Sequence, residues 1–371
     1  MIITLIIVLA FVVLIYLFLQ QAQFGKRPSG NRLELIKNSP NYKNGTFQNL
    51  SHTPDLTEGV SFFSVMKEFL FNKNEFKKPN QIIPSTKTNL LELDLLENVV
   101  IWFGHSSYFM QIDGKKILVD PVLSGSASPL SFTTKAFNGT DVYTTDDFPE
   151  IDYLFISHDH WDHLDYKTIM KMKPKIKTVI CGLGTGAHFE HWGFNSDSII
   201  EKDWNETIIL EDGFEVNTVP ARHFSGRSFI RNKALWTSFV LQTPTSKLFI
   251  GGDSGYDTHF IEIGKQFGPF DLAFLENGQY DKSWKYIHMT PNEVLQAAIN
   301  LNAKALFPVH SSKFVLANHD WNEPLKKITE LAKATDIYLI TPIIGEKTTL
   351  NHKKVFPKWW ELSNEVIQES I

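Results

Sequence analysis

The sequence lacks two things that would place it in a class at once: cysteines in number and an excess of positive charge. Cys181 is the only cysteine among 371 residues, so an intramolecular disulfide is excluded and a compartment that keeps thiols reduced is permitted. The formal net charge is -5, from 36 Lys and Arg against 41 Asp and Glu. Nonspecific binding to a phosphate backbone requires a basic field, so we expect no nucleic-acid partner.

The N-terminus lacks charge altogether. Ile2 to Leu19 is almost wholly apolar, and its length reaches the short end of the roughly 17–25 residues that span a bilayer. A cleaved signal peptide would carry Lys or Arg before the apolar run and small residues at a cleavage site after it. No Lys or Arg precedes this run, and Gln-Gln-Ala-Gln follows Leu19. We therefore interpret residues 1–20 as a transmembrane anchor in preference to a signal peptide.

Positive charges follow the anchor and predict its orientation. Lys26, Arg27, Arg32 and Lys37 all lie after the span. The positive-inside rule then gives a single-pass membrane protein whose folded body is cytoplasmic.

Residues 21–97 are polar and rich in Asn, Pro, Ser and Lys, which is typical of a linker and N-terminal extension. One aromatic patch, at residues 62–71, has the spacing of an amphipathic helix. Such a face packs on a folded domain more often than it enters a membrane interface, so we expect packing.

From Asn98 the chain alternates short apolar strands, turns and helical patterns. Strands are expected at 99–103, 108–112, 116–120, 153–157, 178–181, 214–219, 238–241 and 247–250. Helices are expected at 257–267, 290–301 and 323–334, the last two with Pro near their starts. This mixture predicts an α/β domain over residues 98–350, with helices flanking packed sheets, and a tail at 351–371.

One turn concentrates potential metal ligands. After the strand at 153–157 the chain reads His158-Asp159-His160-Trp161-Asp162-His163. Alternation directs His158 and His160 the same way, and the turn returns Asp162 and His163 beside them. Imidazole nitrogens with a carboxylate oxygen suit Zn²⁺, although iron or manganese also bind such sites. A solvated loop with structural hydrogen bonds is the alternative, and four such residues in this pattern favour metal.

The pattern His-x-His-x-Asp-His resembles the signature of the metallo-β-lactamase superfamily. The resemblance extends over most of Val100 to Thr349 and is closest to the N-acylphosphatidylethanolamine-hydrolysing phospholipase D group. It implies an αβ/βα four-layer sandwich that holds two zinc ions. The matching runs are 102–105, 119–121, 251–256, 267–273, 309–310 and 314–318.

The resemblance also implies which residues hold the metals. One zinc would be held by His158, His160 and His223, and the other by Asp162, His163 and His310, with Asp253 bridging. Asp162 and Asp253 would also be the catalytic carboxylates. In the implied reaction a hydroxide shared by the metals attacks a phosphodiester, which gives phosphatidic acid and an N-acylethanolamine. The implied partners are a phospholipid substrate and the membrane.

Other residues have less certain roles in the same scheme. His288 matches a family histidine near the substrate, but Ile287 stands where the family has glutamine. Trp161 either contacts substrate at the pocket mouth or packs. His105 and Asp120 are expected to brace the loops under the site.

Two other functions are compatible with the same residues. The same dizinc site could hydrolyse a lactone, amide or other ester, because one fold supports many reactions. A non-catalytic, membrane-tethered binding protein is the other alternative, and the complete ligand set disfavours it. The sequence leaves the oligomeric state open.

Overall fold

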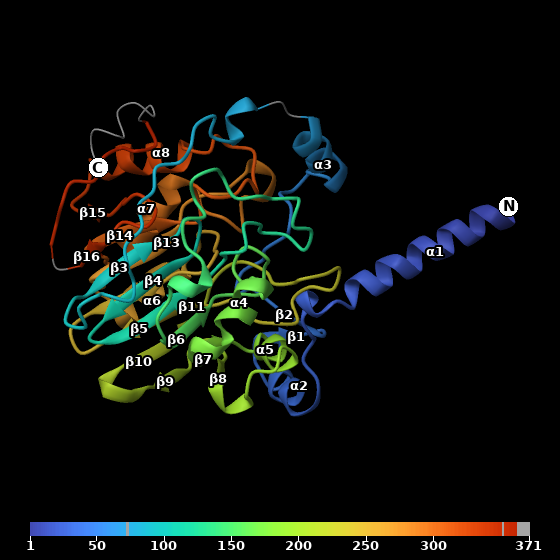
Figure 1. The fold of residues 1–371 in the computed structure, drawn as a ribbon, viewed down its shortest axis with the longest axis horizontal. Coiled ribbons are helices and arrows are strands. Elements are labelled where there is room, and N and C mark those ends of the chain that lie inside the picture. The colour runs from blue at the N-terminus through green and yellow to red at the C-terminus, as the bar shows by residue number, and fades with distance from the viewer. Residues whose placement is uncertain (72–73, 351, 362–371) are drawn as a thin grey trace.

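The computed structural model describes residues 1–71, 74–350 and 352–361, and its centre is a pair of seven-stranded sheets (Figure 1). The first sheet has the order β16-β3-β4-β5-β6-β7-β8, formed by Thr348–Thr349, Val99–Trp102, Tyr108–Ile112, Lys115–Val119, Ile151–Ile156, Ile176–Gly182 and Ile199–Lys202. The second has the order β15-β14-β13-β12-β11-β10-β9, formed by Tyr338–Leu339, Ala305–Val309, Leu272–Glu276, Lys247–Ile250, Ser238–Gln242, Glu215–Val219 and Thr207–Ile209.

Helices cover the outer faces of the two sheets. The first sheet is covered by α4 (Tyr166–Met172) and α5 (Gly186–His191), and the second by α6 (His259–Phe267), α7 (Pro291–Asn300) and α8 (Glu323–Ala332). Short 3-10 turns, η1 to η7, occupy Ala22–Phe24, Glu75–Lys77, Thr145–Asp147, Lys173–Lys175, Ser196–Ser198, Glu211–Gly213 and Lys282–Trp284. The expected αβ/βα four-layer sandwich is confirmed.

Alternation along β3 explains why its four residues are all apolar and buried. Val100 and Trp102 pack toward the second sheet, whereas Val99 and Ile101 pack with the residues of α4 and α5. Successive side chains of a strand point to opposite faces, and here both faces are covered. Helix α7 begins where the sequence predicted, because Thr290 and Glu293 form a capping box and Pro291 occupies the first turn.

The site residues follow the carboxyl ends of parallel strands. His158 comes two residues after β6, Asp253 three residues after β12, and His310 directly after β14. The strands β5, β6 and β7 run parallel in the first sheet, and β12, β13 and β14 run parallel in the second. Residues from both sheets are thereby delivered to one edge of the sandwich, which is where α/β proteins place their ligands.

The N-terminal helix α1 (Ile2–Leu19) projects from the body, and none of its residues is buried (Figure 1). It is long and apolar enough to cross a membrane. The chain after it, predicted from its composition to be a linker and N-terminal extension, lies partly against the sandwich. Helix α2 (Gly30–Lys37) and the hairpin of β1 (Tyr42–Lys43) and β2 (Thr46–Phe47) bury Ile36 and Phe47 against Trp204 and Trp236.

The aromatic patch forms helix α3 (Phe62–Phe71), but none of its ten residues is buried. The expectation that this patch packs on the domain was wrong. The outer faces of both sheets are already covered by α4 to α8, and α3 lies instead beside the mouth of the site.

The described part of the C-terminal tail closes one end of the core. Trp359 and Trp360 are buried, and the ring of Trp359 lies 6.3 Å from that of Trp102. The rest of the predicted tail, residues 362–371, lies outside the described residues.

Candidate metal centre

Three histidines place ring nitrogens at the spacing of ligands that share one metal. His158 Nε2 lies 2.9 Å from His160 Nδ1, which lies 3.3 Å from His223 Nε2. Nitrogens about 2.0–2.1 Å from a tetrahedral zinc lie about 3.3 Å from one another. His223 Nδ1–H donates to the carbonyl oxygen of Ile287 at 2.9 Å, which leaves the Nε2 lone pair facing the other two rings.

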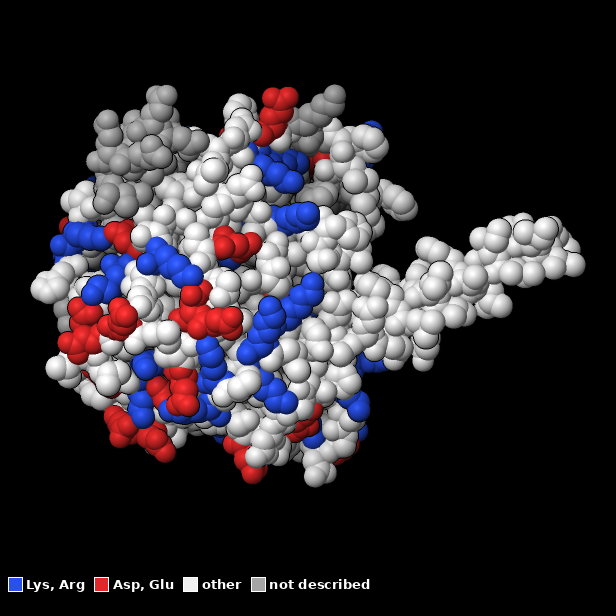
Figure 2. Space-filling model, in the orientation of Figure 1, with Lys and Arg blue, Asp and Glu red and all other residues white. Residues whose placement is uncertain are grey.

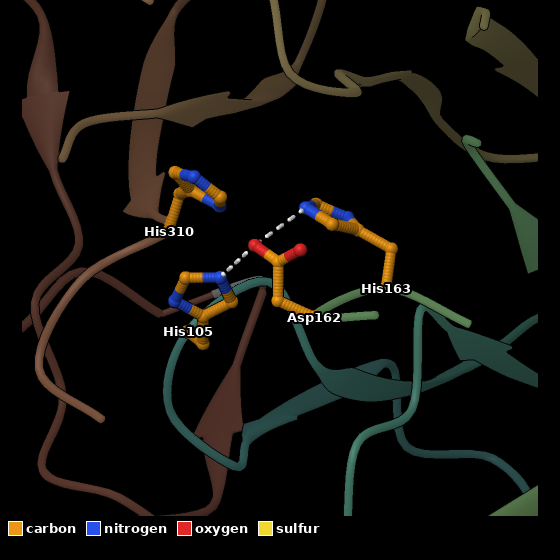
Figure 3. A group of neighbouring side chains, drawn as sticks. All are labelled: His105, Asp162, His163 and His310. Atoms are coloured by element: carbon orange, nitrogen blue, oxygen red, sulfur yellow. Dashed lines mark hydrogen bonds and ion pairs between the residues drawn. The ribbon is translucent and has the colours of Figure 1, made fainter. Parts of the chain in front are cut away.

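A second group brings together His105, Asp162, His163 and His310 (Figure 3). Asp162 Oδ2 lies 2.9 Å from His105 Nε2 and 3.5 Å from His163 Nε2. His310 Nδ1 lies 2.9 Å from Ser106 Oγ. The spacing of residues in the sequence does not predict that His310 lies beside Asp162. The two residues meet because the two sheets pack face to face.

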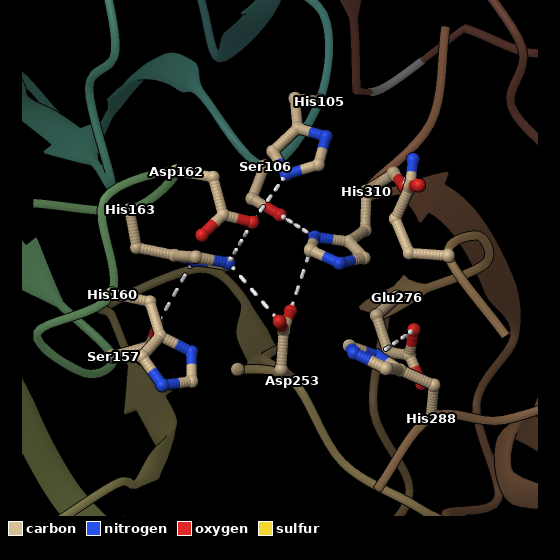
Figure 4. Close-up of polar contacts among 12 residues, drawn as sticks. His105, Ser106, Ser157, His160, Asp162, His163, Asp253, Glu276, His288 and His310 are labelled. Carbon is tan, nitrogen blue, oxygen red and sulfur yellow. Dashed lines mark hydrogen bonds and ion pairs between the residues drawn. The ribbon is translucent and has the colours of Figure 1, made fainter. Parts of the chain in front are cut away.

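Asp253 lies between the two groups (Figure 4). Its Oδ2 is 3.2 Å from His163 Nε2, 3.8 Å from His223 Nε2 and 3.9 Å from His158 Nε2. Its Oδ1 is 3.1 Å from His310 Nδ1. Asp253 therefore approaches residues of both groups, with Oδ2 near members of each and Oδ1 near His310 of the second.

Two residues, His105 and Asp120, accept or donate hydrogen bonds that orient the candidate metal ligands. A carboxylate can only accept, so His105 Nε2–H donates to Asp162. Likewise His163 Nδ1–H donates to Asp120 Oδ2 at 2.8 Å, and Asp120 also accepts from the N–H and Oγ–H of Ser157 at 2.9 and 2.6 Å. Such contacts fix the tautomer and ring orientation of metal ligands, which agrees with the bracing roles expected for His105 and Asp120.

Burial and neighbouring charges shift the pKa values of the clustered histidines and carboxylates. Burial lowers the pKa of His158 and His223 well below the usual value, and that of His160 to about 4. Burial by itself would raise the pKa of Asp162 and Asp253, but the imidazole of His163 and its neighbours hold both well below the usual value. Neutral imidazoles at His158, His160 and His223 beside ionised carboxylates are protonation states that bind a divalent cation. At His163, by contrast, the carboxylates of Asp253, Asp162 and Asp120 outweigh burial and raise the pKa well above its usual value.

The residues fit a metal for a further reason. His163 Nε2 and Asp253 Oδ1 are buried without a hydrogen bond, and the polar atoms near them, Asp253 Oδ2 at 3.2 Å and His310 Nδ1 at 3.1 Å, belong to other candidate ligands. A buried polar atom left without a hydrogen bond costs about 1–3 kcal/mol, and a cation between the groups would satisfy both atoms. Nitrogen and carboxylate donors in these numbers suit zinc, and iron or manganese to a lesser degree.

A cavity of about 550 Å³ opens over the donors. It contains His288, which the sequence placed near the substrate. Trp161 lies apart from it: its ring packs edge-on against Phe24 at 5.2 Å and faces the Arg227 guanidinium at 4.0 Å. The lining residues are Asp55, Leu56, Phe62, Val65, His160, Asp162, His223, Phe224, Arg231, Asp253, Gln279, Trp284, Ile287, His288, His310 and Leu316.

Sequence reasoning missed two charged residues of this site. Glu276 ends β13, and its Oε2 lies 3.2 Å from His288 Nδ1; burial raises the pKa of Glu276 to about 7. A polar residue at the carboxyl end of an apolar strand was the available signal. Arg231 lines the cavity, lies 3.8 Å from the Phe224 ring centroid and pairs with Asp55 at 2.6 Å. Its loop carries no motif that would have predicted it.

The segment directly after α1 is linked by hydrogen bonds to the loop that carries His158 to His163. Arg227 donates to the carbonyl oxygens of Gln23 at 2.9 Å and of Asp159 at 2.8 Å. The Lys26 backbone N–H donates to His188 Nδ1 at 3.0 Å, and His188 Nε2 lies 3.2 Å from Asp159 Oδ2. The end of the apolar helix is therefore held in a fixed position relative to the metal donors.

Residues 115–311, more than half of the chain, match the profile of the Beta-lactamase superfamily domain. The chain belongs to the metallo-β-lactamase superfamily. An uncharacterized protein of Mycobacterium tuberculosis is 34% identical over 328 residues, which cover 87% of this chain and 88% of the relative. This family membership makes the chain a relative of metal-dependent hydrolases.

A second similar member is the N-acyl-phosphatidylethanolamine-hydrolyzing phospholipase D 1 of Caenorhabditis elegans. It is 28% identical over 263 residues, covering 66% of this chain and 74% of the relative. Among solved structures, Igni18, a metallo hydrolase of Ignicoccus hospitalis, aligns over 69% of this chain and 100% of its own with a TM-score of 0.52. At 22% sequence identity this likeness shows the metallo-β-lactamase fold alone.

Proposed function

We propose that this metallo-β-lactamase superfamily member is a zinc-dependent phosphodiesterase of phospholipase D type. It cleaves N-acylphosphatidylethanolamine to phosphatidic acid and an N-acylethanolamine. The observation that carries the proposal is the composition of one cavity, where the metal donors lie beside apolar walls and a guanidinium. A phosphodiester that carries acyl chains needs all three: metal donors for the reaction, a guanidinium for the phosphate and apolar walls for the chains.

Seven residues hold the metals in this proposal. His158, His160 and His223 would hold one zinc ion, Asp162, His163 and His310 would hold the other, and Asp253 would be available to both groups. When bound, two zinc ions supply Lewis acidity toward a phosphoryl oxygen and a water whose pKa falls toward 7. A nucleophilic side chain is then not required. The buried carboxylates of Asp162 and Asp253, the proposed catalytic pair, remain ionised, because nearby imidazoles lower their pKa.

Other side chains of the cavity recognise the substrate. Arg231 places its guanidinium at the wall, where it can bind a phosphate oxygen. His288, paired with Glu276, faces the same space and positions a polar group of the substrate. The acyl part contacts apolar side chains, namely those of Leu56, Phe62, Val65, Phe224, Ile287 and Leu316.

The proposed substrate is a membrane lipid, and the protein carries a candidate membrane anchor. Helix α1 is the proposed membrane anchor, and the positive-inside rule applied to Lys26 and Arg27 favours a cytoplasmic body. An anchored enzyme meets a lipid that would otherwise have to leave the bilayer. The C. elegans relative, named for hydrolysis of the same lipid, supports this substrate class.

The test is mass spectrometry of the products formed from N-acylphosphatidylethanolamine by the purified protein. The reaction is run as isolated, after chelation, and after zinc is restored. We expect phosphatidic acid and N-acylethanolamine in the first and third reactions and neither in the second. Two bound metals with no product would contradict the substrate, and would direct attention to lactones, amides and other esters. A chain that binds no metal would instead be the membrane-tethered binding protein.

A further inference from the structure

Helix α3 leaves a set of large apolar side chains exposed, although the Lys77 side chain lies over the Phe69 ring. Phe63 is 84% exposed and Leu70 is 65% exposed, and Phe62, Met66, Phe69 and Phe71 are exposed as well. Monomeric soluble domains rarely leave such a contiguous patch in water. The helix stands on the side of the molecule from which α1 projects (Figure 1).

Two loops add to this surface at the foot of α1. Phe229 is 83% exposed, and with Ile230 it lines a cavity whose other walls include Tyr16 and Leu19 of α1. Phe132 is 70% exposed, and its loop is tied to the end of α1 by the Gln23 side chain, which donates to the Pro129 carbonyl oxygen at 3.4 Å. We call α3, Leu130, Phe132, Phe229 and Ile230 the apolar rim.

Next to the apolar rim, an uncharged helix is followed by cationic side chains, as in proteins at a membrane surface. Figure 2 shows α1 as an uncharged rod. Lys26 and Arg27 follow its end after six residues and line the same cavity as Phe229 and Ile230. Apolar side chains with cations at their base match the order of hydrocarbon and anionic headgroups in a leaflet.

The mouth of the metal site lies within this surface. Phe62 and Val65 of α3 line the cavity that contains His160 and Asp253, and Arg231 in its wall directly follows Phe229 and Ile230 in sequence. The contacts of Gln23 and Lys26 hold the foot of α1 at a fixed distance from this mouth.

We infer that the apolar rim inserts into the leaflet that α1 enters, so that the metal cavity opens onto the bilayer surface. A lipid headgroup then reaches the metal donors while its acyl chains stay among Phe62, Val65 and the hydrocarbon. The identity of that lipid rests on the proposed phospholipase activity, but the insertion of the rim does not.

The single cysteine makes a direct test possible. Cys181 is fully buried, so the unaltered chain provides a blank for thiol labelling. Phe63→Cys, Phe132→Cys and Phe229→Cys each add one accessible thiol for an environment-sensitive fluorophore. The matched control is Ile209→Cys on β9, the edge strand of the second sheet, where the native side chain is 75% exposed. Each full-length variant is placed in phosphatidylcholine nanodiscs with or without a spin-labelled lipid as quencher.

We expect the spin-labelled lipid to quench the three rim labels several-fold more than the label at 209, and iodide in the water to do the reverse. Iodide quenching of the rim labels equal to that at 209 would overturn the inference. Shielding from both quenchers would also overturn it, since a second copy of the chain would then cover the rim. The three sites lie in separate segments, so loss of one variant to misfolding leaves two readouts. Quenching reports position alone, so it is independent of whether any phospholipid is hydrolysed.

Discussion

His158 is held from both sides of its ring. Its Nδ1 lies 3.0 Å from Ser157 Oγ, and its Nε2 points into the histidine trio. We expect His158→Ala to remove one ligand and to lower turnover by more than the roughly 10–100-fold that loss of a residue behind a metal ligand costs. Metal content by mass spectrometry and hydrolysis of dispersed substrate are measured together. His191→Ala, at an exposed histidine, is the control; full activity of His158→Ala would contradict the metal assignment.

Asp120 contacts His163 directly, and it reaches His158 through the Ser157 hydroxyl. Asp120→Asn keeps the shape of the side chain but removes the charge that holds the proton on His163 Nδ1. We expect zinc affinity to fall about 10–100-fold, the range for residues that orient metal ligands. Competitive titration with a chromophoric chelator measures it, with Asp146→Asn at an exposed position as the control. An unchanged zinc affinity would show that Asp120 contributes only to folding.

At the scale of elements, the turn after α1 depends on one glycine. Gly25 has φ +70°, and a Cβ there would lie 1.9 Å from His188 Nδ1. We expect Gly25→Ala to push His188 away from Asp159 and to destabilise the protein by about 1–3 kcal/mol, as overpacking does. Gly30→Ala is the matched control, because Gly30 also has positive φ but nothing lies within 4 Å of its Cβ position. Equal unfolding midpoints in urea for the two variants would refute a packed junction at Gly25.

At the scale of the whole molecule, α1 and the segment after it have separable roles. Deletion of residues 1–19 is expected to release the protein from membranes and to leave hydrolysis of a dispersed substrate intact, because none of α1 is buried. Sedimentation with membranes and product assays on the soluble fraction measure the two effects.

Deletion of residues 1–28 is the informative comparison. It also removes the partners of Arg227, Trp192 and His188, each hydrogen bond being worth about 0.5–1.5 kcal/mol. We expect this longer deletion to lower the melting temperature and the activity, whereas the shorter one lowers neither. Equal activity of the two would show that the junction does not support the site.

Much of the fold could be predicted from local sequence. The short, largely apolar runs at 99–103 and 108–112 specified strands, and the capping residues Thr290 and Glu293 specified the start of α7, because both signals depend on neighbouring residues alone. The turn from His158 to His163 indicated a candidate metal site for the same reason.

Only the tertiary structure decided how distant residues meet. His223, Asp253 and His310 lie near His158 because the two sheets present the ends of their strands at one edge, and no spacing in the sequence encodes that distance. Arg231 and Glu276 entered the site in the same way. Amphipathic spacing correctly indicated a helix at 62–71, but periodicity cannot tell what its apolar face meets. Whether that face meets protein or membrane depends on which surfaces the rest of the chain has already covered.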